Sequence, residues 1–346
     1  TPIFVWVVWW VGMAFISAIF GNLWSLVNPW SIFFEIGEWI FKKVKYSSRY
    51  PIWCDKWPVV ILFFIFAWME LITDLAEQPR MLSSLIIFYS FMTWTGMFIF
   101  GRRKWLENGE VFHAIFNLFS RFAPINGKPN SLVLRVPSSG LLVDRPVSMP
   151  ETYFVLLLLS TVTFDGILET PLWMSILTWI SENLALRPLL IYLQEIGVDI
   201  ISLIKLIALL VIPCTFFSIF FSICHIIGEF GSGGKVPTRA VIGYFVFSLV
   251  PIAIAYHLSH YLSYLLIAGQ QIIPLISDPF SQGWNIFGTV GYRIDIGIIN
   301  AKLVWYLAIV SIIVGHIFAV YISHLVAIQV FPDRKAALSS QYPMMV

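Results

Sequence analysis

Two histidines, His257 and His260, lie three positions apart in a long apolar stretch, and their imidazoles are the groups best suited to chemistry in this chain. A second apolar stretch carries His316 and His324. Ionisable side chains are costly inside a segment apolar enough to enter a bilayer, so each one found there is a functional-site hypothesis. In a helix, positions i and i+3 share one face about 4.5 Å apart along the axis. His257 and His260 are therefore expected to point at the same spot.

Two carboxylates are expected to join these imidazoles. Asp165 lies in a further apolar stretch, at a depth similar to that of His316, and Glu169 follows one turn later on the same face. Imidazole and carboxylate ligands without thiolates suit zinc, iron or manganese. The sequence thus predicts a buried metal site in which His257, His260 and His316 are the metal ligands. Asp165 would be a general base or a further ligand, and Glu169 would orient an imidazole.

The same residues also have structural interpretations. A histidine in a membrane helix can be a hydrogen-bond partner of a backbone carbonyl or a neighbouring helix, and this applies to His316. His324 is closer to the basic end of its stretch and is expected to line an interface. Asp165 and Glu169 can instead flank a helix break at Pro171 and cap the helix that follows it.

Membrane helices are the elements expected to position these residues. The chain is 59% hydrophobic and 12% charged, against roughly 25% charged residues in soluble domains. A helix needs about 20 mostly apolar residues to cross a bilayer. Stretches of this kind lie at about 2–20, 57–73, 82–100, 151–168, 197–226, 240–266 and 302–328. The predicted fold is an all-α polytopic bundle of about seven spans, forming a single integral membrane domain over 1–346.

The basic residues predict the orientation of this bundle. Threading seven spans places all but five of the 21 lysines and arginines on one side, which is the cytoplasmic side by the positive-inside rule. The N-terminus of the chain is then outside. A net charge of +2 is a topology signal in this setting, and we expect no nucleic-acid partner. The closing YPMMV predicts one further helix beyond Val346.

The segments between the spans are of three kinds. Residues 28–45 and 103–122 mix aromatic and charged side chains at helical spacing, which predicts interfacial helices. Within the cytoplasmic segment 124–150, SLVLRVPSSGLLVDRP alternates around Ser-Ser-Gly and predicts a hairpin. The long segment 267–301 is an outer loop, and its aromatic and isoleucine content favours an ordered lid or plug.

Common catalytic and cofactor motifs are missing from the sequence. It has no GxSxG, Walker loop, HExxH or GxGxxG. It also lacks CxxC and CxxCH, which excludes covalent haem attachment and zinc-ribbon sites.

Several strings resemble a family of polytopic bacterial membrane proteins that includes members labelled fenitrothion hydrolase. The strings are YHLSHYLSYLLI, SDPFSQGWNIFGT, YRIDIGII, FPDRKAALSSQYPMM, STVTFDGILET and NPWSIFFE. The resemblance runs over nearly the whole chain, but it involves no catalytic motif. It implies a protein of a bacterial or archaeal cytoplasmic membrane that cleaves an organophosphorus triester. The polar strings include His257, His260, Asp165 and Glu169.

Three functional hypotheses follow. The first is a metal-dependent hydrolase, in which the histidines hold a divalent ion that activates water. The second is a haem- or metal-bearing subunit of a membrane redox complex, for which His260 and His316 would be axial ligands on facing helices. The third is a transporter or structural subunit with a polar pathway. The expected partners are the lipid bilayer and other membrane subunits.

Overall fold

The computed structural model of this chain describes residues 2–41, 48–128, 131–331 and 333–344. The chain is mostly helical, at 76%, as predicted. It divides into two compact units that are interleaved in sequence. The first comprises Thr1–Cys54, Glu77–Leu142 and Val250–Ile322, and the second comprises Asp55–Ala76, Val143–Leu249 and Ser323–Val346.

The first unit contains the segments that carry His257, His260 and His316. Its helices and strands are η1 (Phe4–Val11), α1 (Gly12–Phe20), α2 (Trp24–Val27), α3 (Pro29–Phe41), α5 (Pro79–Phe100), α6 (Arg102–Asn108), α7 (Val111–Ser120), β1 (Ile125–Lys128), β2 (Ser131–Leu134), η3 (Ser139–Leu141), α13 (Val250–Ala268), η5 (Gly269–Gln271), α14 (Ile272–Ser277), η6 (Ile296–Ile298) and most of α15 (Ala301–Val330).

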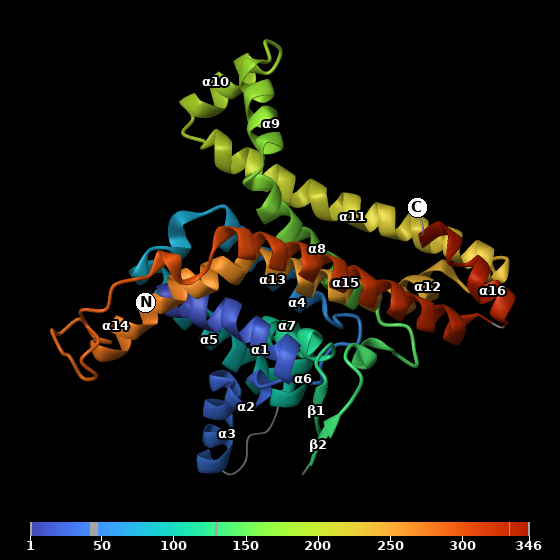
Figure 1. Ribbon diagram of the computed structural model, residues 1–346, viewed down its shortest axis with the longest axis horizontal. Coiled ribbons are helices and arrows are strands. Elements are labelled where there is room, and N and C mark those ends of the chain that lie inside the picture. The colour runs from blue at the N-terminus through green and yellow to red at the C-terminus, as the bar shows by residue number, and fades with distance from the viewer. Residues whose placement is uncertain (1, 42–47, 129–130, 332, 345–346) are drawn as a thin grey trace. The chain divides into compact units, whose positions relative to one another are not determined.

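The second unit contains Asp165 and Glu169. Its elements are α4 (Trp57–Leu71), η2 (Asp74–Ala76), α8 (Met149–Leu168), α9 (Pro171–Glu182), α10 (Arg187–Glu195), α11 (Ile200–Ser232), α12 (Thr238–Phe245), η4 (Val246–Leu249), the end of α15, α16 (Arg334–Ser339) and η7 (Tyr342–Met344). The short helices α9 and α10 form a hairpin that extends beyond α8 and α11 (Figure 1).

Five helices in the described part of the chain are long and apolar enough to cross a membrane. They are Pro79–Phe100, Met149–Leu168, Ile200–Ser232, the continuous helical stretch Thr238–Ser277, and Ala301–Val330. The other two predicted spans are also helical, but they form the shorter apolar helices Phe4–Phe20 and Trp57–Leu71. Length and composition therefore give five candidate spans, against the seven predicted from the sequence.

The predicted interfacial helices are shorter or broken. Helix α3 covers Pro29–Phe41, and the predicted end at 42–45 lies outside the described residues. The segment 103–122 is divided into α6 and α7 by a break at Gly109. Only glycine fits at this break, because a Cβ at Gly109 would lie 2.8 Å from the ring of Trp105.

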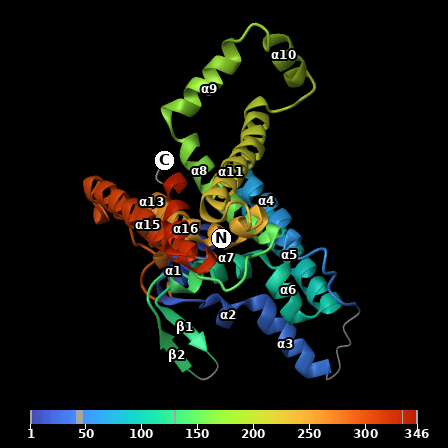
Figure 2. The same ribbon diagram turned by 90° about the vertical axis from the view of Figure 1, so that its right-hand side faces the viewer.

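The two strands form an antiparallel pair within the predicted 124–150 segment (Figure 2). Strand β2 lies where the alternating pattern placed it, but its partner is β1, with Ile125 opposite Leu134. The predicted turn at Ser-Ser-Gly is instead part of the 3₁₀ turn η3 and the residue before it. Strand β1 could not be predicted, because its sequence INGK lacks an alternating apolar pattern.

Helices α13 and α15 pack closely within the first unit. A Cβ at Gly315 would lie 2.4 Å from the Cβ of Ala255 and 2.8 Å from the carbonyl oxygen of Pro251, so only glycine permits this approach. Further along, Ser259 Oγ is 3.1 Å from the carbonyl oxygen of Ala308. These contacts fix which levels of the two helices lie side by side.

Candidate functional site

His257 lies in an enclosure of aromatic rings inside the first unit. Its side chain is only 4% exposed. The ring of Tyr261 is closest, with centroids 4.8 Å apart, and those of Phe15, Phe119 and Trp10 follow at 5.8, 6.0 and 6.3 Å. These rings come from η1, α1, α7 and α13 itself. The prediction that His257 is buried is therefore confirmed.

The N-terminal segment supplies part of this enclosure through an unusual backbone. Residues Phe4–Val11 form a π-helix of eight residues, whereas π-helical geometry elsewhere is mostly a single turn. The neighbouring residues Trp9 and Trp10 both contact rings of α7, since each lies within 6.2 Å of Phe112 and of Phe116. The π-helix thus turns two consecutive indoles toward α7 and places Trp10 against His257.

His260 lies beside His257 on α13 but is only half-buried. Its ring contacts Tyr261 with centroids 4.7 Å apart and planes nearly perpendicular at 86°. Both imidazoles therefore touch the same phenol ring. The shared contact with Tyr261 agrees with the expectation that His257 and His260 point at the same spot.

His316 does not lie at the level of this pair. Its side chain is exposed on α15, and its Nδ1 is 2.8 Å from the carbonyl oxygen of Ile312 one turn earlier. Because the adjacent Gly315 packs between Pro251 and Ala255, His316 lies at a level of α13 about five residues before His257. At 1.5 Å per residue this is an axial offset of about 7 Å. The convergence of His316 with the pair stays a prediction.

Asp165 and Glu169 belong to α8 in the second unit. Asp165 is half-buried, and Glu169 is exposed at the end of the helix. Phe164, which directly precedes Asp165, is fully buried and packs against Ile72 and Leu209. Helix α8 ends at Leu168 and α9 begins at Pro171, so Glu169 flanks the expected break. The cap of α9 is Thr170 instead, with its Oγ1 3.4 Å from the backbone nitrogen of Trp173.

The described residues contain no group of three or more His, Cys, Asp or Glu side chains placed to hold a metal ion. Within the first unit, the chemistry available at the predicted site is that of two imidazoles and a phenol on α13. A zinc, iron or manganese site therefore stays a prediction.

A second polar centre in the first unit was not predicted from the sequence. Glu110 is completely buried, and its carboxylate accepts five hydrogen bonds. The backbone N–H groups of Phe112 and His113 donate at 3.0 and 2.8 Å, so Glu110 caps α7. Three side chains donate from elsewhere: Tyr89 Oη at 2.7 Å, Asn28 Nδ2 at 3.1 Å and Trp24 Nε1 at 3.5 Å.

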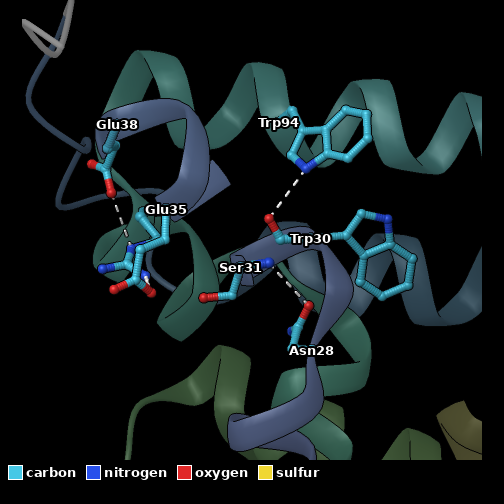
Figure 3. A network of polar contacts seen from close by, with 7 residues as sticks. Asn28, Trp30, Ser31, Glu35, Glu38 and Trp94 are labelled. Carbon is cyan, nitrogen blue, oxygen red and sulfur yellow. Dashed lines mark hydrogen bonds and ion pairs between the residues drawn. The ribbon is translucent and has the colours of Figure 1, made fainter. Parts of the chain in front are cut away.

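Glu110 thereby joins α7 to α5 and to the segment that begins α3. Asn28 uses its other side-chain atom, Oδ1, to accept from the backbone nitrogen of Ser31 at 3.2 Å, and Trp94 Nε1 donates to the carbonyl oxygen of Trp30 at 3.2 Å (Figure 3). Burial raises the pKa of Glu110, while its donors oppose that shift. Since α7 carries Phe119, the centre at Glu110 helps to fix one wall of the His257 enclosure.

The sequence holds one local signal for this centre. Gly109 interrupts the helical pattern of 103–122, and an acidic residue directly after such a break is a candidate N-cap. The donors from Asn28, Trp24 and Tyr89 leave no signal of their own, because they lie far away in the sequence.

No protein-family profile matches this chain, and no curated protein or solved structure is significantly similar to it. The resemblance to the family that includes fenitrothion hydrolases therefore stays a prediction.

Proposed function

We propose that this chain is a multi-pass membrane protein that binds a divalent metal ion through His257 and His260 and uses it to hydrolyse an organophosphorus ester. The observation that carries the proposal is the arrangement of the two imidazoles on α13. One is enclosed among aromatic rings and the other is accessible, and both contact Tyr261.

The membrane topology is part of the proposal. Five helices are suited to cross a bilayer, and Phe4–Phe20 and Trp57–Leu71 complete seven spans when they cross together with their flanking residues. The chain then lies in the cytoplasmic membrane of a bacterium or archaeon with its N-terminus outside. The distribution of lysine and arginine supports this orientation.

The proposed metal ion would explain why the reaction is a hydrolysis. A divalent ion held by neutral imidazoles lowers the pKa of its bound water and polarises a phosphoryl oxygen. Catalytic zinc sites have three protein ligands and one open position, so His257 and His260 would need a third ligand besides the bound water. The resemblance of YHLSHYLSYLLI to the family labelled fenitrothion hydrolase supports a phosphotriester as the substrate class.

A structural role for His257 is the second candidate, and its aromatic contacts favour it. An imidazole packed among Trp10, Phe15, Phe119 and Tyr261 contributes buried surface whether or not it binds a ligand. In that case the chain is a structural subunit of a larger membrane assembly, and a ring of similar size can replace the imidazole without loss of function.

Hydrolysis of a dialkyl nitrophenyl thiophosphate by the purified full chain tests the proposal. We expect His257→Phe and His260→Phe each to lower the rate of nitrophenolate release by well over an order of magnitude. The matched control is His225→Phe, because His225 is exposed in the second unit with its Nδ1 3.1 Å from Thr238 Oγ1. If His257→Phe and His260→Phe hydrolyse the ester as fast as the unchanged chain, or if the unchanged chain releases no nitrophenolate above background, the hydrolase proposal fails.

A further inference from the structure

The segment between α14 and α15 exposes apolar side chains although its backbone is held in place by hydrogen bonds. We call residues 278–298 the apolar loop. Its exposed large hydrophobic residues are Phe280, Trp284, Ile286, Phe287, Val290, Tyr292, Ile294, Ile296 and Ile298. So many exposed large apolar side chains in one segment normally mark a contact with a partner or a membrane.

Ser277 holds the first half of the apolar loop. Its side chain is fully buried, and its Oγ accepts from the backbone nitrogens of Phe287 at 3.2 Å and Thr289 at 3.3 Å. Thr289 Oγ1 lies 2.6 Å from the same oxygen and donates to the carbonyl oxygen of Ile273 at 2.8 Å. Asp278 closes the tip, since its carboxylate accepts from two backbone nitrogens at 2.8 Å.

Gln270 fastens the second half of the apolar loop to the end of α13. Its Nε2 donates to the carbonyl oxygens of Leu266 and Asp295, each at 2.9 Å. Its Oε1 accepts from Tyr292 Oη at 2.8 Å and from the backbone nitrogen of Asp295 at 2.9 Å. One buried amide therefore uses both of its ends to bind the loop.

These bonds produce an inverted distribution of polarity. The polar groups of Ser277, Gln270 and Asp278 bind the backbone, and the aromatic and aliphatic side chains face outward beside a smaller number of exposed polar residues, which include Gln282, Asn285 and Arg293. A loop that projects into water gains nothing from this arrangement, because exposed apolar surface costs about 25 cal/mol per Å² relative to burial. The arrangement is favourable when the outward face meets an apolar medium.

The position of the apolar loop in the chain identifies that medium. It directly joins the helical stretch Thr238–Ser277 to Ala301–Val330, and both are long and apolar enough to cross a membrane. Its anchor Gln270 lies within the first of these stretches. The loop is therefore held at a membrane surface, and tryptophan and tyrosine are the residues enriched at that depth.

We propose that the apolar loop is a membrane-dipping element, with Phe280, Trp284 and Phe287 inserted between the lipid head groups and the outer ends of the acyl chains. It lies in the interface as an amphipathic helix does, but it uses a loop fixed by Ser277, Gln270 and Asp278. The proposal concerns lipid contact alone and stands independently of any metal site.

Site-directed spin labelling of the full chain in phosphatidylcholine vesicles tests this proposal. The three native cysteines are replaced, and one cysteine is introduced at Phe287, which is exposed and has no core packing to lose. Ile313→Cys on α15 provides a lipid reference. Arg103→Cys provides a water reference, because the Arg103 side chain is 90% exposed.

The measured quantity is the ratio of collisions with oxygen to collisions with a water-soluble nickel chelate. We expect the ratio at 287 to lie near that at 313 and several-fold above that at 103, and Trp284→Cys to give the same result. A ratio at both loop positions equal to that at 103 overturns the proposal. Exclusion of both reagents overturns it too, because the loop is then covered by protein instead of lipid.

Discussion

Removal of the Glu110 carboxylate is expected to destabilise the first unit strongly. In Glu110→Ala, five donors lose their acceptor inside a completely buried centre. Loss of the helix cap costs about 1 kcal/mol, and each buried donor left unsatisfied costs about 1–3 kcal/mol. Trp24 contributes least, because its 3.5 Å bond is the longest. Tyr89 and Asn28 therefore dominate the side-chain contribution.

The total expected loss is about 3–5 kcal/mol, which is the usual cost of breaking a buried charged network. For a folded unit of about 200 residues, a loss of this size lowers Tm by at least about 6 °C. Thermal unfolding of the detergent-solubilised chain, followed by tryptophan fluorescence, measures the shift. Glu110→Gln keeps one acceptor oxygen and is expected to fall between Glu110→Ala and the unchanged chain.

Glu107→Ala is the matched control, three residues earlier in the sequence. The Glu107 side chain is 40% exposed and pairs with Arg103 at 2.9 Å and Lys104 at 3.5 Å. Exposed ion pairs of this type contribute about 0–1 kcal/mol, so Tm is expected to change little. Equal Tm values for Glu110→Ala and Glu107→Ala would refute the assignment of Glu110 as the centre that joins α7 to its neighbours.

Two further predictions concern helix packing and pH. Gly315→Ala places a methyl group 2.4 Å from the Cβ of Ala255, so a destabilisation of about 1–3 kcal/mol is expected from overpacking. The control is Gly37→Ala in α3, where the added methyl group meets nothing within 4 Å, so Tm should stay the same or rise. Similar Tm losses for Gly315→Ala and Gly37→Ala would contradict the close crossing of α13 and α15. Burial raises the pKa of Glu110 above the ordinary value of 4.5, so its carboxyl holds a proton more tightly in the folded state. That contribution to stability is present below pH 4.5 and is lost as the pH rises through the folded-state pKa. The Tm difference between the unchanged chain and Glu110→Gln should therefore shrink as the pH rises, and a difference that grows with pH would exclude this shift.

The sequence was sufficient to locate the long apolar helices because the signal for them is local. Composition and run length mark apolar helices regardless of what packs against them. The same reasoning identified His257 as a buried residue, because an ionisable group in an apolar helix is conspicuous. Its aromatic neighbours come from η1, α1 and α7 and could not be predicted, since they depend on how separate helices pack.

The level of His316 relative to the pair could not be predicted for a related reason. The distance from the end of a span gives only an approximate depth, whereas the level of one helix against another is set by side-chain packing. Here Gly315 fixes it by admitting Ala255 and Pro251. Glu110 was missed because a carboxylate on an amphipathic segment normally faces water, and the donors Asn28 and Trp24 are 82 and 86 residues away.

The metal content of the purified full chain tests the central claim most directly. The unchanged chain, purified without chelator and analysed by elemental mass spectrometry, should carry about one equivalent of zinc, iron or manganese. His257→Phe should lose that metal while Tm stays close to its original value, because a phenyl ring preserves the contacts with Trp10 and Phe119. A metal-free chain that hydrolyses the ester at full rate, or metal retained equally in His257→Phe, would contradict the account.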